Sequence, residues 1–573
     1  MLPLERQPEE VPPERAAETL PVPPGETAPA GDLVAVTIDG VAVKVPKGST
    51  IFQASEQAGY TPPHFCYHRD LSIPANCRMC LCEVEGQGKL QPSCTAVVAD
   101  GMAVRFDTDS VREAIQGVME FEFKNHPLDC PVCDQVGECY LQRYYLEVGK
   151  YVPLPIERVH KDKVKDLGPI TLDAERCVLC TRCVRFGEEI AGTADFVIAH
   201  RSDHSEIMTF DDRPIGTQYA LNYTDICPVG ALTSNDFRFR KRVYYLESTH
   251  SVCPECSTGC NVYADTAENE LYRYRPRYND AVNDSWMCDP GRLSHARMAD
   301  TSDRLVEPTA GVEPLGWEEA VRRAAEGLGR LGGSVAAIAH PDLSNEDLAA
   351  LAALVRAAGG DRIDFRADDS WRGVDELVDG ILIRRDPHAN TRGALEILGL
   401  AGSESAVASI LSETAAGRLR GLIVCGWSPE ALGEAGRKAI EKAEWAVFAG
   451  PREVPGLEVF DLVLPTCVHV EREGTFTNHA GRVQRFQAAL TPYEASRPAW
   501  RVFEEIRAAI AGDAPAAGPA EAFARVAEAA PAFAGLSLEQ VGDQGIWLRG
   551  YEQESTSPVG ADPRPGVRAP NIG

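Results

Sequence analysis

Alternating apolar and polar positions mark the first foldable stretch of the chain, VAVTIDGVAVKVPKGSTIFQASEQAG, which begins at Val34. Two such runs flank Asp39 and Gly40, a pair that is typical of the tight turn in a β-hairpin. A helix is predicted to follow, with its N-terminus near Ser49 or Thr50. This part of the chain should therefore begin with two antiparallel strands and a helix.

Helical periodicity replaces the alternation in SVREAIQGVMEFEFKN, whose apolar side chains recur every three or four residues. Ser110 and Glu113 have the spacing of a capping box, which predicts the start of a helix. Pro127 disfavours helical backbone in the residue before it, so the helix should end near Asn125. His126 would then stand at the C-terminus of this helix.

From about Val306 the pattern changes to alternating helices and short apolar runs. GWEEAVRRAAEGLGRL and NEDLAALAALVRAA have helical periodicity, whereas SVAAIAH, RIDF, RGLIVCGW and EWAVFAG are typical of buried strands. This alternation predicts an open, mostly parallel α/β sheet. Gly327, Gly329 and Gly332 match the spacing of a dinucleotide-binding loop, but they end a helix and precede a strand, the reverse of the required order. The sequence therefore shows no evident site for NADH, flavin or an organic substrate.

The length and the net charge of the chain limit the number of domains and the kinds of partner that we expect. At 573 residues it exceeds the usual size of one hydrophobic core, so several domains are expected. The net charge of −28 argues against nucleic acid or anionic lipid as the main partner, because both repel an acidic surface. No apolar run reaches the length that crosses a bilayer, so membrane association should come only through partner subunits. The proline- and glutamate-rich start, up to about Asp32, lacks the apolar segment of a secretory signal and is expected to be disordered.

Eighteen cysteines are the most informative feature of the composition. They stand in tight groups in a large chain without an export signal, a distribution that favours metal binding over disulfides. Fifteen cysteines and one histidine sort by spacing into four groups of four in the N-terminal half. The other three, Cys82, Cys425 and Cys467, are predicted to be packed thiols.

The first group contains Cys66, Cys77, Cys80 and Cys94. A strand hairpin, a helix and then a cysteine loop is the order of plant-type [2Fe–2S] ferredoxins, although the first spacing is shorter in those proteins. His64 and His68 lie close by in the sequence and are expected to stand behind the ligands or on the surface.

The second group, in HPLDCPVCDQVGECYLQ, contains His126, Cys130, Cys133 and Cys139. Three cysteines leave one corner of a four-iron cube unfilled, and His126 is the nearest further ligand. The alternative is a helix-terminal histidine that interacts only with the helix dipole. We predict that His126 is a ligand.

The third group contains Cys177, Cys180, Cys183 and Cys227. The triplet CVLCTRC followed by a remote Cys-Pro is half of the bacterial ferredoxin signature, so Cys227 should complete a single [4Fe–4S] cube. The nearby Arg176, Arg182 and Arg185 could stabilise a reduced cluster, but we predict that they are surface charges.

The fourth group contains Cys253, Cys256, Cys260 and Cys288. Taken alone, its spacing also fits a structural zinc site. Because three other groups indicate iron and sulfide, a further [4Fe–4S] cluster is the preferred prediction.

With these groups in view, the chain resembles the large iron–sulfur subunit, known as the G subunit, of bacterial NADH:quinone oxidoreductase, respiratory complex I. The resemblance runs from about Leu33 to about Glu505 and rests on CYHRDLSIPANCRMCLCEVEG, GVMEFEFKNHPLDCPVCDQVGECYLQ, RCVLCTRCVRFGEE and DICPVGALTS. It implies one [2Fe–2S] cluster on the first group and [4Fe–4S] clusters on the second and third groups. These three would relay electrons from the flavin-bearing NADH subunit towards the quinone-proximal subunits. The fourth group would hold a [4Fe–4S] cluster off this path.

The resemblance also implies the fold class, the location and the domain order. The fold would be multidomain α+β and α/β, with a ferredoxin-like β-grasp first and a degenerate, shortened molybdopterin-oxidoreductase-like domain without cofactor last. The protein would lie on the cytoplasmic side of the inner membrane, attached through other peripheral-arm subunits, and would have no NADH or quinone site of its own. The expected parts are a disordered tail (1–32), a [2Fe–2S] domain (33–110), a one-histidine, three-cysteine domain (111–150), a ferredoxin-like [4Fe–4S] domain (151–245), a further [4Fe–4S] domain (246–302), the α/β domain (303–511) and a partly disordered extension (512–573).

The alternative identification is the catalytic subunit of an NAD-linked formate dehydrogenase, which shares this cluster order but holds molybdenum. A lysine is expected after the fourth group in those enzymes, in a C-x-K-G arrangement. Here Cys288 is followed by DPGR, with a proline at that position. No molybdopterin is therefore expected.

Overall fold

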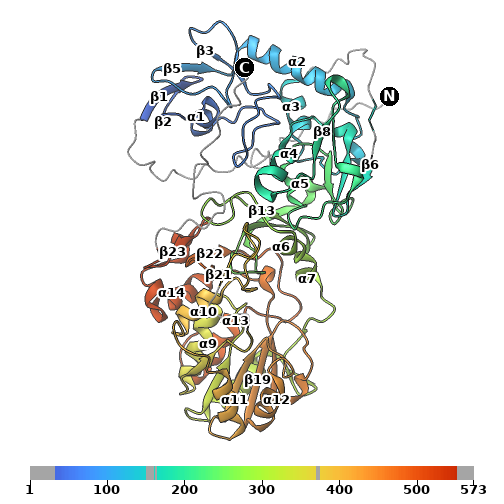
Figure 1. The fold of residues 1–573 in the computed structure, drawn as a ribbon. Helices are drawn as coiled ribbons and strands as arrows, with labels where there is room; N and C mark the ends of the chain where they lie inside the picture. Colours follow the sequence, from blue (N-terminus) through green and yellow to red (C-terminus); the bar gives the residue numbers. More distant parts are fainter. Residues whose placement is uncertain (1–32, 150–159, 162–163, 370–374, 552–573) are drawn as a thin grey trace, which may run out of the picture. The chain divides into compact units, whose positions relative to one another are not determined.

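The structure is a computed structural model, and it describes residues 33–149, 160–161, 164–369 and 375–551 (Figure 1). The predicted disordered tail, residues 1–32, lies outside this range. Within it the chain divides into two compact units at the peptide bond between Tyr245 and Leu246. No helix of the described residues is both long enough and apolar enough to cross a membrane.

The first unit opens with the predicted hairpin and helix. A five-stranded sheet has the order β2-β1-β5-β3-β4. Its strands are β1 (Leu33–Ile38), β2 (Val41–Pro46), β3 (Leu81–Val84), β4 (Gln91–Pro92) and β5 (Met102–Arg105). Asp39 and Gly40 both have positive φ in the turn between β1 and β2, as a type I′ hairpin requires. Helix α1 (Ile51–Gln57) begins at Thr50, whose hydroxyl accepts a hydrogen bond from the Gln53 amide.

Two helices follow, α2 (Asp109–Asn125) and α3 (Tyr140–Val148). Helix α2 ends at His126, as predicted, but the predicted capping box is wrong. Thr108 is the N-cap and its hydroxyl accepts from the Val111 amide at 3.3 Å. Ser110 already lies inside the first turn, so its hydroxyl is past the position that caps the helix.

The remainder of the first unit consists of small sheets and single helical turns. One sheet contains β6 (Val164–Asp166), β7 (Ile170–Asp173) and β10 (Leu232–Ser234), and another contains β8 (Val197–Ala199) and β9 (Glu206–Met208). Helices α4 (Arg182–Phe186) and α5 (Asn222–Ile226) are short. Strand β10 pairs with β7, with Leu232 opposite Leu172. This pairing places the segment after Cys227 beside the segment before Cys177.

The second unit begins with a three-stranded meander, β11 (Glu247–Val252), β12 (Asn261–Ala267) and β13 (Glu270–Pro276). Two short helices follow, α6 (Asp289–Leu293) and α7 (His295–Ala299). The first three cysteines of the fourth group occupy the loop between β11 and β12, and the fourth one precedes α6.

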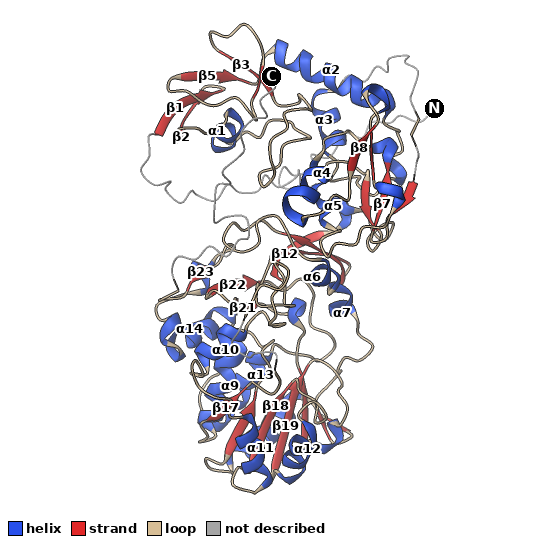
Figure 2. Cartoon of the chain, in the orientation of Figure 1, coloured by secondary structure: helices blue, strands red, loops and turns tan. Residues whose placement is uncertain are grey.

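The second unit contains a seven-stranded sheet of order β15-β14-β20-β19-β18-β16-β17, and Figure 2 labels its neighbouring strands β18 and β19. The strands are β14 (Thr309–Ala310), β15 (Glu313–Pro314), β16 (Val335–Ile338), β17 (Arg362–Asp364), β18 (Gly421–Cys425), β19 (Trp445–Gly450) and β20 (Leu462–Pro465). Strands β16 to β20 are parallel, which confirms the predicted mostly parallel sheet. The glycines of the nucleotide-like pattern lie at the end of helix α8 (Trp317–Gly329) and before strand β16, in the predicted reverse order.

Helices cover both faces of this sheet, because its strands are apolar on both sides. Alternate residues of one strand enter different cores: Val335 and Ala337 join one cluster, and Ala336 and Ile338 the other. Besides α8, the helices are α9 (Asn345–Ala357), α10 (Thr391–Ile397), α11 (Val407–Ala415), α12 (Gly433–Lys442) and α13 (Ala499–Ala511).

The chain remains structured beyond Gly512, where the sequence suggested no element. Helices α14 (Pro519–Ala529) and α15 (Leu538–Val541) join the core of α9 and α13, and β23 (Ile546–Trp547) completes a sheet with β21 (Gly474–Thr477) and β22 (Arg482–Phe486). The tail expected to be disordered begins at Tyr551, which the structure still describes, and its remainder from Glu552 onwards lies outside the described residues.

Candidate metal centres

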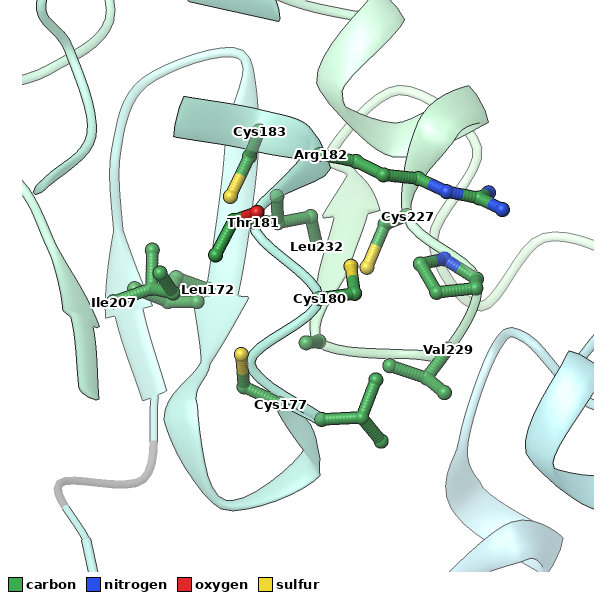
Figure 3. A pocket seen from close by; sticks show the side chains of 13 residues that line it. Leu172, Cys177, Cys180, Thr181, Arg182, Cys183, Ile207, Cys227, Val229 and Leu232 are labelled. Carbon is green, nitrogen blue, oxygen red and sulfur yellow. The ribbon is translucent and has the colours of Figure 1, made fainter. Parts of the chain in front are cut away.

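The third group surrounds a small space between α4, α5 and the β7–β10 pair. In Figure 3 the four sulfur atoms point into this space, and apolar side chains including Leu172, Ile207 and Leu232 line the rest of it. Leu179 and Thr181 have left-handed backbone between the cysteines of the triplet. Such strained positions persist only where the surroundings hold them, and here they wrap the loop around the four sulfurs.

Backbone amides are directed at these sulfurs. The Leu179 amide donates to Cys177 Sγ at 3.4 Å, and the amides of Val229, Ala231 and Leu232 interact with Cys227. Burial nevertheless raises the pKa of Cys177 to about 12 and that of Cys180 to about 11. Thiols in this environment would be neutral unless a metal cation deprotonated them. The amide donors and the apolar lining therefore fit a bound iron–sulfur cluster.

The sulfurs of the first group form two close pairs. The Cys77 thiol donates to Cys66 and lowers the pKa of Cys66, against the effect of burial, and Cys94 does the same for Cys80. The Phe65 amide also donates to Cys77 Sγ at 3.4 Å. Two pairs of thiolates are the donor arrangement that two bridged irons require.

The second group is drawn from the ends of two helices. His126 is the C-cap of α2 and Cys139 the N-cap of α3, with Cys130 and Cys133 at a single 3₁₀ turn between them. Burial raises the pKa of Cys133 and raises that of Cys139 to about 12, and the other two thiols of the group add to the rise for Cys139. The His126 ring lies edge-on to Phe123, with centroids 6.2 Å apart.

Three arginines beside the third group are buried, so the sequence-based preference for surface charges is wrong. Arg176, Arg182 and Arg185 are 6%, 3% and 7% exposed. Their guanidinium groups bind backbone carbonyls of neighbouring cysteine loops, which sequence spacing does not reveal.

Arg182 and Arg185 join the third group to the first. Arg182 donates to the carbonyls of Tyr67 at 2.6 Å and Ile226 at 3.1 Å. Arg185 donates to the carbonyl of Cys66 at 2.6 Å and to that of Cys180 at 3.4 Å. Each arginine therefore bridges backbone next to a first-group cysteine and backbone next to a third-group cysteine.

Arg176 and Gly230 join the third group to the second. Arg176 donates to the Asp129 carboxylate at 2.6 Å and to the Gly230 carbonyl at 3.4 Å. A Cβ atom on Gly230 would lie under 3.0 Å from Cys133 Sγ, so only glycine fits there. The Tyr140 amide also donates to the Pro228 carbonyl at 2.9 Å.

The fourth group has the same character within the second unit. Cys253, Cys260 and Cys288 are buried, which raises the pKa of all three thiols. The Gly291 amide donates to Cys288 Sγ at 3.4 Å, and a Cβ atom on Gly291 would lie 3.0 Å from Cys253 Sγ. Sulfurs from both ends of the group thus meet at this glycine.

The remaining side chains singled out by sequence have structural surroundings. Cys82, Cys425 and Cys467 are buried, as predicted. His64 and His68 are half-buried rather than exposed, and burial lowers the pKa of His64 to about 3.

Iron–sulfur segments followed by an α/β domain define a class, the iron–sulfur proteins that carry a molybdopterin-oxidoreductase-like fold. Models of known families match in this order: a 2Fe-2S iron-sulfur cluster binding domain (31–109), the NADH-ubiquinone oxidoreductase-G iron-sulfur binding region (116–151), the ferredoxin-like domain of NADH-quinone oxidoreductase subunit 3 (168–233), the molybdopterin oxidoreductase Fe4S4 domain (246–300) and molybdopterin oxidoreductase (454–509).

Individual relatives give the same result. The chain is 30% identical over 594 residues to the mitochondrial NADH-ubiquinone oxidoreductase 78 kDa subunit of Candida albicans, covering 82% of each chain. It is 36% identical over 350 residues to the G subunit of the NADH-quinone oxidoreductase of Rickettsia felis, covering 60% of this chain and 52% of that protein. Identity to the G subunit of the Streptomyces coelicolor enzyme is 40% over 349 residues, covering 59% and 41%. The chain belongs to the family of NADH-quinone oxidoreductase G subunits, although it spans only about half the length of the two bacterial relatives, 52% and 41%.

Proposed function

We propose that this chain is an electron-conducting subunit of the peripheral arm of an NADH:quinone oxidoreductase. Its first unit would hold one [2Fe–2S] and two [4Fe–4S] clusters, which supply one-electron carriers when bound. The first, second and third groups are the proposed ligands: Cys66, Cys77, Cys80, Cys94, His126, Cys130, Cys133, Cys139, Cys177, Cys180, Cys183 and Cys227. The main support is that all three groups lie in one compact unit. Arginines beside the third group form hydrogen bonds to the loop of the first group and to the loop of the second group.

The contacts support an order for the three sites that differs from their order in the sequence. The third group touches the first through Arg182 and Arg185, and the second through Arg176 and Gly230. We propose that electrons pass from the first group to the third and then to the second. The apolar lining and the amide donors would exclude water and stabilise the charge on the sulfurs.

The spacing of the sulfurs supports iron–sulfur clusters over zinc. Among the described residues, one trio of cysteine, histidine or carboxylate side chains places its donor atoms within 4.8 Å of one another. That trio contains no cysteine. Thiolates at about 2.3 Å from one zinc ion lie roughly 3.8 Å apart. In the part of the chain that the structure describes, no three cysteine sulfurs gather this closely, which suits a cage of several irons better than a single zinc ion.

The fourth group would hold a [4Fe–4S] cluster that lies off this path, with Cys253, Cys256, Cys260 and Cys288 as ligands. We propose that the α/β domain binds no molybdopterin, since Pro290 stands where a molybdenum-dependent formate dehydrogenase is expected to have lysine. The partners would be the flavin-bearing NADH subunit and other peripheral-arm subunits on the cytoplasmic side of the membrane.

Metal and sulfide analysis of anaerobically purified protein tests this proposal. We expect about fourteen irons per chain, with matching acid-labile sulfide, and no molybdenum. About ten irons would leave the fourth group empty or zinc-bound. Stoichiometric molybdenum would favour the formate dehydrogenase alternative. A colourless, iron-free protein that still supported NADH-driven quinone reduction in its complex would overturn the proposal.

A further inference from the structure

Two histidines and an aspartate lie together in the second unit, away from all four cysteine groups in sequence. His340, Asp342 and His388 place one donor atom each within 4.8 Å of one another. Asp342 Oδ1 lies 2.6 Å from His388 Nδ1, and Asp342 Oδ2 lies 3.5 Å from His340 Nδ1. Two imidazoles and one carboxylate are the donors that first-row transition ions prefer in proteins.

The sheet topology places this trio where α/β proteins bind ligands. The chain passes from β16 to β17 on one side and then to β18 on the other side of β16. The order of strands reverses at this point, and ligands in open α/β sheets bind at the carboxyl ends of the strands that flank such a reversal. His340 follows β16 by two residues, and Trp427 follows β18 by two.

The neighbours of His340 hold its ring in place. The Trp427 ring lies over it, with centroids 4.6 Å apart, and the Trp427 indole donates to the Ala339 carbonyl at 2.7 Å. The Asp342 amide donates to His340 Nδ1 at 3.2 Å. An ion pair between Asp342 and His388 would not require a second imidazole nearby. The His340 ring nevertheless lies beside the His388 ring, at 89° to it and with centroids 5.4 Å apart.

Further charged residues surround the trio. Asp386 is 5% exposed and its carboxylate accepts from the His388 amide at 3.0 Å. Asp368, after β17, also interacts electrostatically with both histidines. Two further acidic residues therefore lie near the trio, and the Arg472 guanidinium also donates to the Asp342 carbonyl, at 3.2 Å.

We propose that His340, Asp342 and His388 form a binding site for a divalent transition-metal ion, with zinc as the ion to test. Zinc at about 2.0–2.2 Å from nitrogen and oxygen donors places those donors roughly 3.4 Å apart, so adjustment of the side chains suffices. His388 is 46 residues from Asp342. The ion would tie the loop after β16 to the segment before α10.

Zinc content and zinc coordination test the site in the full chain with its iron–sulfur clusters. The protein is equilibrated with zinc chloride, desalted, and analysed for zinc, iron and sulfide. We expect about one zinc per chain, lost in the double variant His340→Ala, His388→Ala and reduced in Asp342→Asn, with iron unchanged. His200→Ala is the matched control, since that imidazole faces the single carboxylate of Glu206 at 3.4 Å.

X-ray absorption of the wild-type protein does not depend on how the variants fold. Nitrogen and oxygen neighbours at about 2.0–2.1 Å, without sulfur, are expected. Sulfur at about 2.3 Å would place zinc on a cysteine group and overturn the site. So would the absence of bound zinc, or zinc retained in full by the double variant. The iron count is independent of these outcomes, so the proposed electron-transfer role is judged separately.

Discussion

His126 differs from the fifteen cysteines proposed as ligands in its charge. A neutral imidazole in place of a thiolate removes one negative charge from the site, which favours the reduced form. The end of helix α2 explains where His126 lies. Pro127 stops the helix, so His126 is its C-cap and stands at the start of the cysteine loop.

His126→Cys should therefore lower the reduction potential of the second-group cluster by on the order of 100 mV. It should also abolish a mild fall of that potential with rising pH, since the imidazole takes up a proton more readily when the cluster is reduced. EPR-monitored redox titration at several pH values measures both effects. An unchanged potential in the variant would exclude His126 as a ligand.

Gly230 has a steric role that its sequence context does not reveal. It lies in the segment CPVG after the last third-group cysteine, yet its missing Cβ makes room for Cys133 of the second group. One methyl group at this position would push apart two proposed cluster sites.

Gly230→Ala should reduce iron content and weaken the EPR signals of the second-group and third-group clusters, while the first-group signal persists. Gly216→Ala is the control, because a Cβ atom there meets nothing within 4 Å. Full iron content and an unaltered spectrum in Gly230→Ala would contradict this account of the close approach.

At the scale of elements, α4 acts as a connector because each of its two arginines donates to backbone of both the first-group loop and the third group. A guanidinium fork can donate to several carbonyls at once, whereas an ammonium group cannot reproduce that geometry. Substitution with lysine therefore keeps the positive charge of these arginines and removes their hydrogen-bond geometry, so the two effects can be measured separately.

Arg185→Lys should keep the charge but lose hydrogen bonds to the first-group loop, at a cost of roughly 1.5–3 kcal/mol for a charged donor. Loss of cluster absorbance in guanidinium chloride under anaerobic conditions should shift to lower denaturant. Arg112→Lys, at an exposed arginine paired with Asp107, should change the midpoint little. Equal midpoints for Arg185→Lys and the wild type would argue against the bridging role.

At the scale of the whole molecule, the two units offer separate signals. All seven tryptophans of the chain follow Leu246 in the sequence, so tryptophan fluorescence reports the second unit. Within that unit Glu346 is buried, and its carboxylate accepts from the Thr475 amide at 2.9 Å and the Thr475 hydroxyl at 2.8 Å. Burial raises the pKa of Glu346 from 4.5 to about 7.

The second unit should therefore lose stability as pH rises from about 4.5 to about 7. The folded chain binds the Glu346 proton more tightly than the unfolded chain, so stability falls where that proton is lost, by about 3 kcal/mol in total. Glu346→Gln should remove this contribution. Fluorescence-detected denaturation of both proteins between pH 5.5 and 8 measures the difference. A stability difference that did not vary with pH would contradict the prediction.

Local sequence signals predicted the secondary structure well where they are strong. Asp39 and Gly40 lie at the hairpin turn, and Pro127 ends α2 next to His126, because turn residues and proline restrict the backbone itself. The capping prediction at Ser110 failed because two neighbouring residues could each cap, and only the extended backbone at Thr108 decided between them.

By itself, the sequence determined the family, the parallel sheet and the grouping of cysteines, since hydrophobic period and ligand spacing are local properties of the chain. The tertiary structure alone decided which groups touch. Arg182 reaches Tyr67 across 115 positions of the chain, and Gly230 meets Cys133 across a similar gap. Likewise, His340 and His388 approach each other only because the segment before α10 packs against the loop that follows the carboxyl end of β16. Such contacts depend on the packing of distant segments, for which the spacing of residues along a single chain carries no signal.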